Sequence, residues 1–175
     1  SLAMLDNSKY LSRVENNWEK MAIYYAMIKP EGRGSIRKLP FFNDPFVQFR
    51  LSNKDLINLS DGLKKMCELL FSAGAKNLFP SIKDYGSISS TDDIKLIPNS
   101  LPRMKTNLMT IHLFSSCPMG EDENICSANS YGEIFGKKNL FVNDGSLIPS
   151  APGVNPQGTI MAIARRNIHH FLGKE

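Results

Sequence analysis

The sequence predicts an α+β fold with a mainly antiparallel sheet, and three observations support this prediction. Segments with helical and strand-like patterns are mixed along the chain, without the regular alternation that a doubly wound parallel sheet requires. Two longer segments carry apolar residues at helical spacing, whereas the strand-like segments are short and lie between turns. With 175 residues, 42% of them hydrophobic and 22% charged, the chain has the length and composition of one ordinary globular domain.

The first part of the chain is predicted to form a helix followed by strands. From Asn7 to Met21, apolar residues recur three and four positions apart, which is typical of an amphipathic helix. Aromatic and branched residues from Ala22 to Ile28 then run into a turn with Pro and Gly, and residues 35–39 complete a predicted β-hairpin. A further strand is predicted from Pro45 to Leu51.

A long helix is predicted to follow and to end at Ala73. The residues from Ser52 to Asp55 resemble a capping box in which Asp replaces the usual Glu, and a long apolar-periodic stretch comes after them. Gly74 occupies the position just past the last turn, where glycine commonly ends a helix.

The next part of the chain contains a long loop and two short predicted strands. Residues 81–103 are rich in Ser, Asp and Pro, so a loop is predicted there, with a short helical turn at 92–96. Strands are predicted at 108–114 and at 139–143, separated by a polar connection that contains Gly.

A final helix is predicted from Asn155-Pro156 to about Leu172. Asn is a strong N-cap and Pro is favoured at the first helical position, so a purely structural interpretation explains both residues. The same geometry directs the free N–H groups and the positive end of the helix dipole at whatever lies before residue 155. This helix end is therefore also a candidate site for a group that carries negative charge.

The composition argues against nucleic-acid binding and a membrane span, and it bears on the compartment of the protein. The net charge is +4, but Lys and Arg are scattered along the chain, so nucleic-acid binding is not predicted. No apolar run approaches the roughly 20 residues needed to span a bilayer. Three cysteines are an odd and sparse set, which argues against a disulfide framework and favours a reducing compartment, the cytoplasm. Ser1 to Met4 are interpreted as a cloning remnant, so missing targeting signals say little about the parent protein.

One histidine lies where a reactive group is expected. His112 ends an apolar strand just before a Ser-rich loop, and loops on a rigid scaffold commonly carry catalytic groups. From the residues alone, a buried structural histidine is the better interpretation. His169 and His170 lie in the last turn of the final helix, where surface histidines are expected. Asp144-Gly145 follows a short strand, and on its own this pair favours a plain turn.

Four segments in the last third of the chain resemble a known family in their order and spacing. They are His112 to Gly120 (HLFSSCPMG), Asn139 to Ser146 (NLFVNDGS), Pro149 to Asn155, and the helix that follows. Together they are similar to the C-terminal signature of the glucose-methanol-choline (GMC) oxidoreductases, in particular to cholesterol oxidase and long-chain alcohol oxidase members. The resemblance covers about residues 22 to 172. The family's Gly-x-Gly-x-x-Gly loop, which holds the FAD pyrophosphate, does not occur in this sequence.

The resemblance implies that the chain is the C-terminal, substrate-side portion of a flavin-dependent alcohol oxidoreductase. It implies that His112 is the catalytic base that takes the hydroxyl proton of an alcohol while hydride leaves for flavin N5, and that Asn155 pairs with it. A base is needed because the pKa of an alcohol hydroxyl lies far above neutral. The residues implied to approach FAD are Asp144, Gly145, Gly153, Val154, Asn155 and Pro156.

The resemblance also implies an organisation in three parts. Residues 1–21 form an N-terminal helix or linker, residues 22–138 the substrate-binding domain, and residues 139–175 a strand-helix segment that returns to the FAD-binding domain. The expected fold is an antiparallel sheet of about six strands with helices on one face. Alone, the chain is expected neither to hold FAD nor to be active. Its expected partners are the missing N-terminal FAD-binding domain, a small alcohol substrate and, through exposed apolar surface, a second copy.

Two residues near the histidine depart from the family pattern. Ser115 stands where the family has Gly, and Pro118 stands where many relatives have Arg. A serine is strained at a position that tolerates only positive φ. Ser115 therefore implies either an ordinary backbone at this point or a loop specific to a subfamily.

Two alternative interpretations are less favoured. A zinc site at His112, Cys117 and Cys126 would have three ligands, no obvious fourth and no Cys-x-x-Cys spacing, so no metal is predicted. A non-catalytic binding or interaction module derived from this domain would need neither a flavin partner nor the histidine.

Overall fold

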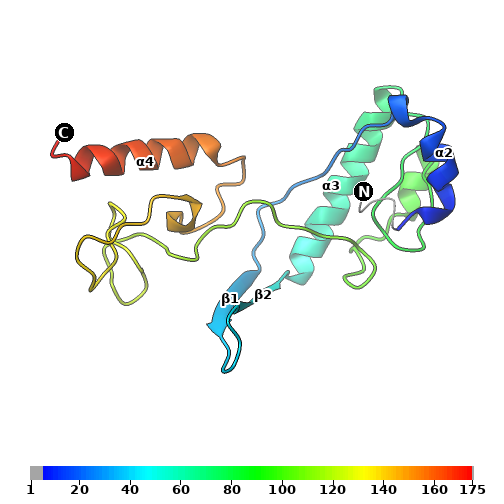
Figure 1. The fold of residues 1–175 in the computed structure, drawn as a ribbon. Coiled ribbons are helices and arrows are strands. Elements are labelled where there is room, and N and C mark those ends of the chain that lie inside the picture. The colour runs from blue at the N-terminus through cyan, green and yellow to red at the C-terminus, as the bar shows by residue number, and fades with distance from the viewer. Residues whose placement is uncertain (1–5, 175) are drawn as a thin grey trace. The chain divides into compact units, whose positions relative to one another are not determined.

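The computed structural model describes residues 6–174, which divide into two compact units (Figure 1). Unit 1 comprises the described residues up to Arg37 together with Phe46–Met109, and unit 2 comprises Lys38–Pro45 together with residues 110 onward. The elements are helices and one small sheet, so the fold is α+β, as predicted. The interpretation of Ser1 to Met4 as a cloning remnant lies outside the described residues. The predicted boundaries at residues 22 and 139 stay predictions.

The N-terminal part of unit 1 is helical but does not form one continuous helix. It consists of η1 (Ser8–Tyr10), α2 (Leu11–Glu15) and η2 (Trp18–Lys20). Asn17, with φ −128° and ψ 18°, lies outside the helical region and interrupts the predicted helix. The Tyr10 ring lies 5.4 Å from that of Phe79, so the helical segments pack on a later loop of unit 1.

A single sheet is found in the described residues, the two-stranded antiparallel hairpin of β1 (Arg33–Lys38) and β2 (Pro45–Arg50). The predicted strands at 35–39 and at Pro45 are confirmed as β1 and β2, which pair with each other. The predicted hairpin partner of 35–39, residues 22–28, is wrong, because these residues have no regular secondary structure. The N–H of Glu31 donates to the side chain of Asp55. The chain before β1 is thus held by a helix end rather than by a strand.

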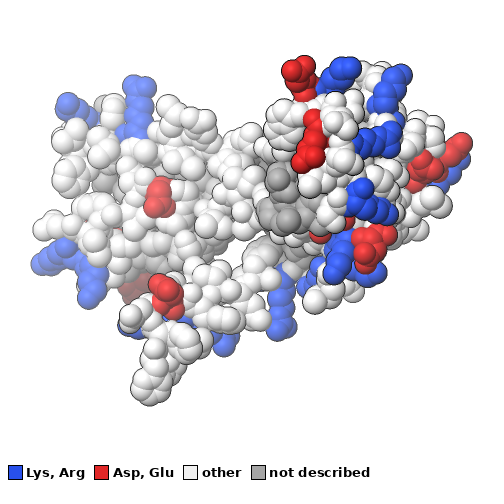
Figure 2. Space-filling view, turned by 45° about the vertical axis from the view of Figure 1, so that its right-hand side comes forward, with Lys and Arg blue, Asp and Glu red and all other residues white. Residues whose placement is uncertain are grey.

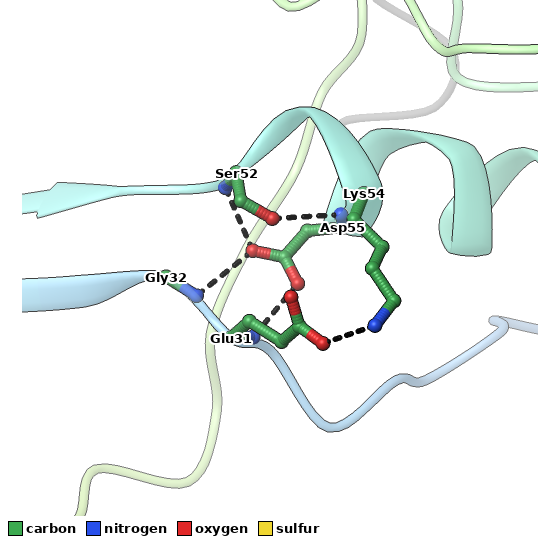
Figure 3. Close-up of polar contacts among 5 residues, drawn as sticks. All are labelled: Glu31, Gly32, Ser52, Lys54 and Asp55. Atoms are coloured by element: carbon green, nitrogen blue, oxygen red, sulfur yellow. Dashed lines mark hydrogen bonds and ion pairs between the residues drawn. The ribbon is translucent and has the colours of Figure 1, made fainter.

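Helix α3 (Asn53–Ser72) begins with the predicted capping box (Figure 3). The backbone N–H of Asp55 donates to Ser52 Oγ at 3.0 Å, and the Asp55 carboxylate accepts from the N–H of Ser52 at 2.7 Å. The same carboxylate accepts from the N–H groups of Glu31 at 2.8 Å and Gly32 at 3.0 Å. One buried side chain therefore caps the helix and fixes the chain that leads into β1.

Helix α3 buries one face against the loop that follows it. Gly74, with φ +95°, ends the helix at the predicted position. An antiparallel bridge between Leu78 and Ile88 and the 3-10 helix η3 (Asp92–Leu96) shape the loop, and η3 is the helical turn predicted there. The buried core residues are Leu56, Cys67, Ile82, Ile88, Ile94, Ile97 and Leu101.

The strands predicted in the second half of the chain are not formed. Residues 108–114 belong to no strand, and residues 139–143 contribute one isolated bridge, between Glu133 and Phe141. A strand depends on hydrogen bonds to a neighbouring strand, and within residues 6–174 no segment pairs with 108–114. The prediction of about six strands with helices on one face is therefore wrong for the described residues.

The loops of unit 2 pack around a small core and against helix α4 (Gln157–Phe171). Ala128 and Leu147 are fully buried, and isolated bridges join Ala128 to Met119 and to Ile134. These bridges give the loops a fixed backbone path although no regular sheet forms.

Helix α4 begins one residue later than predicted. Its N-cap is Pro156, whose carbonyl accepts from the N–H of Ile160 at 2.8 Å, and no side chain caps the helix. The prediction of Asn155 as N-cap is therefore wrong by one position. Asn155 is exposed and lies just outside the helix.

The surface carries charges of both signs without one dominant patch on the visible face. Figure 2 shows Lys and Arg interspersed with Asp and Glu, with wide uncharged areas between them. Among residues 6–174, no helix has the length and the apolar character needed to cross a bilayer.

Candidate active site

Two segments of unit 2 that the sequence singled out lie against each other. The loop that begins at His112 is hydrogen-bonded to the segment from Asp144 to Pro149. The N–H of Cys117 donates to the carbonyl of Ser146 at 3.2 Å, and the N–H of Met119 donates to the carbonyl of Leu147 at 3.0 Å. These two backbone hydrogen bonds place the segment that bears the histidine beside the segment that bears Asp144 and Gly145.

The His112 side chain is half-buried, and its ring centroid lies 6.2 Å from that of Phe114. Its carbonyl accepts a long hydrogen bond of 3.5 Å from Thr110 Oγ1. Among residues 6–174, no group hydrogen-bonds either ring nitrogen of His112. An imidazole in this state can accept a proton at one nitrogen from a group that approaches it.

Asp144 forms a tight turn with the residues after it. Asp144 Oδ1 accepts from the N–H of Ser146 at 2.8 Å, which starts the 3-10 helix η4 (Gly145–Leu147). The hydrogen bonds from Ser146 lower the pKa of the Asp144 carboxyl below its ordinary value, against a smaller opposing effect of burial. The carboxylate is therefore ionised at neutral pH.

Gly145 lies at a close approach of three segments. A Cβ added to Gly145 would lie 3.3 Å from Ile160 Cδ1 of α4, 3.4 Å from the Leu113 carbonyl oxygen and 3.8 Å from Phe114 Cδ1. The first distance is tighter than most Cβ contacts and the second is ordinary van der Waals contact, so an alanine here would require a shift of only a few tenths of an ångström at the end of the Ile160 side chain. Gly145 therefore lies close both to Ile160 of α4 and to Leu113 and Phe114 of the histidine loop.

The start of α4 presents open backbone to solvent. Gly153 has φ +81°, a left-handed conformation that glycine adopts without strain. Val154 is 63% exposed, Asn155 is also exposed, and Pro156 is buried. Because no side chain caps α4, N–H groups of its first turn remain available to an anionic or electron-rich group.

His112 and Asn155 share no hydrogen bond within the described residues, and the Asn155 side chain is not hydrogen-bonded to any of them. Both belong to unit 2. Their predicted catalytic pairing stays a prediction, and so do the cofactor contacts predicted for residues 144, 145 and 153–156.

The structure adds interactions that the sequence did not indicate. Ser115 has φ +63°, and its hydroxyl donates to the Pro149 carbonyl at 2.8 Å. The first of the two alternatives for Ser115, an ordinary backbone, is therefore wrong, and the second, a loop specific to a subfamily, stays a prediction. Asn167 is buried, and its Nδ2 donates to Asn143 Oδ1 at 3.2 Å, next to Asp144. Asn143 and Asn167 are 24 positions apart in the chain, so no local sequence pattern predicts their hydrogen bond.

No metal site accompanies these residues in the described part of the chain. Within residues 6–174, no three His, Cys, Asp or Glu side chains gather closely enough to hold a metal ion. The three cysteines are free thiols.

Comparison with known proteins gives consistent matches. The family model described as GMC oxidoreductase matches residues 30–164. The uncharacterized GMC-type oxidoreductase y4nJ of Sinorhizobium fredii is 49% identical over 150 residues, covering 85% of this chain and 30% of the relative. The long-chain-alcohol oxidase FAO1 of Arabidopsis thaliana is 29% identical over 165 residues, covering 83% of this chain and 21% of that protein. The chain thus spans less than a third of these relatives. No solved structure gives a significant match.

Proposed function

The chain belongs to the GMC oxidoreductase family, and from this membership we propose that it forms the substrate-side part of an FAD-dependent enzyme that oxidises alcohols. The observation that carries the proposal is the contact between the His112 loop and the segment from Ser146 to Pro149. These are two of the motifs that bear the resemblance to the family. Among the relatives are proteins named long-chain-alcohol oxidases, which supports an alcohol as the substrate and a bulky apolar one in particular.

Features of unit 2 fit a flavin cofactor. Gly153 is exposed and carries no Cβ, so the backbone at this point can approach a flat ligand closely. The uncapped start of α4 offers N–H donors and the positive end of a helix dipole. FAD, when bound, would accept the hydride at flavin N5. Asp144, Gly145, Gly153, Val154, Asn155 and Pro156 would hold it.

We assign His112 the role of general base. A ring nitrogen of the neutral imidazole takes the hydroxyl proton of the alcohol as the C–H bond breaks, since hydride leaves an alkoxide-like carbon far more readily than a neutral alcohol. Asn155 would orient the same hydroxyl from the start of α4. The N–H groups that follow Pro156 would stabilise the negative charge that gathers on the reduced ring.

The test uses the longer protein that carries this chain, purified with its flavin. His112→Ala should slow anaerobic bleaching of the flavin by an alcohol by about 10²–10⁴-fold, the usual contribution of a general base. His169→Ala is the matched control, because His169 is an exposed histidine in the last turn of α4, remote in sequence from the motif. Unchanged bleaching in the His112 variant would contradict the proposal and favour a non-catalytic module.

We further propose that the remaining part of the longer protein covers apolar surface of unit 2, and that a second copy covers it when this chain is alone. Several apolar side chains of α4 are exposed, with Met161 63% and Phe171 62% accessible. Light scattering on the isolated chain should then give a dimer, and a concentration-independent monomer would contradict this. The cytoplasmic location stays a prediction.

A further inference from the structure

Ser115 has a backbone conformation that side chains with a Cβ rarely adopt. Its φ of +63° lies in the left-handed region, where the Cβ crowds the following carbonyl. Single residues other than glycine occupy this region when local interactions compensate for the crowding. Ser115 is also exposed, so burial of its side chain cannot be the compensation.

One interaction of Ser115 does offset this conformation. Its hydroxyl donates to the carbonyl of Pro149 at 2.8 Å, a normal distance for such a hydrogen bond. The hydrogen bond joins residues 34 apart in the chain. It therefore joins the His112 loop to the segment after η4 through a side chain, whereas the hydrogen bonds of Cys117 and Met119 to the same segment are made by backbone groups.

Of these hydrogen bonds between the two segments, that of Ser115 is the nearest to His112 along the chain. The backbone ties come later, at Cys117 and Met119. Between Ser115 and His112 lies Leu113, whose carbonyl is 3.4 Å from the Cβ position of Gly145. The Leu113 carbonyl thus lies near Gly145, and the Ser115 hydrogen bond holds the loop two residues further on.

We propose that Ser115 is a positioning residue for His112, holding the histidine loop against the Pro149 segment through its hydroxyl. The inference rests on the proposed function of His112 and adds a residue that acts through it. Without the hydrogen bond, the left-handed turn loses its compensation, and the loop can move away from Pro149. The imidazole would then spend less time in the orientation that accepts the proton.

The first test uses the chain itself and needs no flavin. Ser115→Ala keeps the Cβ and loses the donor, whereas Ser115→Gly loses both the donor and the strain. The control is Ser116→Ala, because Ser116 is an exposed neighbour that makes no hydrogen bond among residues 6–174. Amide exchange at Cys117 and Met119 should become roughly fivefold to tenfold faster in Ser115→Ala, as for the loss of one hydrogen bond, change less in Ser115→Gly, whose backbone needs no compensation, and stay unchanged in the control. Wild-type exchange in Ser115→Ala would overturn the inference.

The second test uses the longer, flavin-loaded protein. The rate of flavin reduction at saturating alcohol should fall roughly tenfold in Ser115→Ala and less in Ser115→Gly, with the half-saturating alcohol concentration unchanged, because misorientation affects the chemical step. Ser116→Ala should leave both quantities unchanged. Normal reduction in the Ser115 variants, while His112→Ala is inactive, would overturn this inference alone. Normal reduction in His112→Ala would instead overturn the proposed function, and the exchange result would still show whether Ser115 fixes the loop.

Discussion

The carboxylate of Asp55 accepts a hydrogen bond of 2.8 Å from the backbone N–H of Glu31, a residue 24 positions earlier in the chain. The same side chain accepts from the N–H groups of Gly32 and Ser52 and is fully buried. Three backbone donors that would otherwise lack a partner are thereby satisfied by one carboxylate. The helix cap and the entry into β1 therefore depend on a single residue of unit 1.

Asp55→Ala should destabilise unit 1 by about 2–4 kcal/mol, because it leaves three N–H groups of a buried region without an acceptor. The change in the free energy of unfolding would be measured by urea unfolding, with hydrogen exchange of the amides in α3 as the probe. Lys54→Ala is the control, since Lys54 forms an exposed ion pair with Glu31 that contributes less than about 1 kcal/mol. Equal losses in the two variants would show that the carboxylate has no special role.

Acid should remove the contribution of Asp55 to stability. Burial by itself would raise the pKa of this carboxyl, but hydrogen bonds from the backbone of Glu31, Ser52 and Gly32 lower it below the ordinary value. A lowered folded-state pKa stabilises the fold above the unfolded pKa of about 3.9, and this stabilisation is lost as the pH falls through the folded pKa. The unfolding free energy of the wild type should therefore fall more steeply below pH 4 than that of Asp55→Asn. Parallel pH curves would contradict the assignment.

Gly32→Ala should be destabilising for a reason separate from the carboxylate. An added Cβ would meet the Arg50 carbonyl oxygen and lie 3.0 Å from Leu51 Cα, so the backbone of β1 or of the β2 end would have to shift. A cost of about 1–3 kcal/mol is expected. Gly158→Ala is the contrasting variant, because nothing lies within 4 Å of its Cβ position in α4 and alanine favours helix, giving up to about 1 kcal/mol of stabilisation. Hydrogen exchange in the two units would resolve both effects, and a neutral Gly32→Ala would contradict the first.

The features predicted correctly from the sequence are those encoded by neighbouring residues. Ser52 and Asp55 of the cap are three positions apart, and Gly74 lies just past the C-cap of the same helix, so the local sequence predicts both features. The hydrogen bond from Glu31 to Asp55 was not, because nothing local marks a partner 24 residues away. The strands predicted at 108–114 and 139–143 failed for a related reason: apolar alternation shows that a segment suits a sheet, but not that a partner strand is present.

In the candidate site, too, local motifs were predictable from the sequence and long-range contacts were not. The motifs identified His112 and Asp144 as residues of interest, and the structure brings their two segments into contact. The positive φ of Ser115 and its hydrogen bond to Pro149 depend on the folded path of the loop, which a serine in sequence does not reveal. The one sign in the sequence was that serine replaces the family's glycine at this position. This replacement left two alternatives open, an ordinary backbone or a loop specific to a subfamily.

Cys67 should resist thiol reagents while the other two cysteines react. It is 2% exposed in the core of unit 1, and burial, with a smaller effect of Glu68, raises the pKa of its thiol to about 11. The thiolate is the reactive form, so at pH 8 Cys67 is protected by both access and ionisation. Mass spectrometry after brief alkylation should find Cys117 and Cys126 modified, since both are partly exposed. Labelling of Cys67 at a similar rate would mean that the core opens readily.

Arg166→Ala should loosen the loop at residues 129–132, whereas Arg165→Ala should have little effect. The Arg166 guanidinium donates to the Ser130 carbonyl and lies 5.2 Å from the centroid of the Tyr131 ring. Arg165 is the adjacent residue on α4 and has the same charge, but its side chain makes no hydrogen bond or ion pair among residues 6–174.

The loss of Arg166 should cost about 1 kcal/mol, because its contacts are exposed to solvent. Exchange of the Gly132 amide, which donates to the Asn129 carbonyl at 2.9 Å, should then become roughly fivefold faster. Since both substitutions remove one positive charge, a general electrostatic effect would accelerate exchange equally in the two variants. Such equality would show that the contacts of Arg166 do not hold the loop, and a difference confined to Arg166→Ala would show that they do.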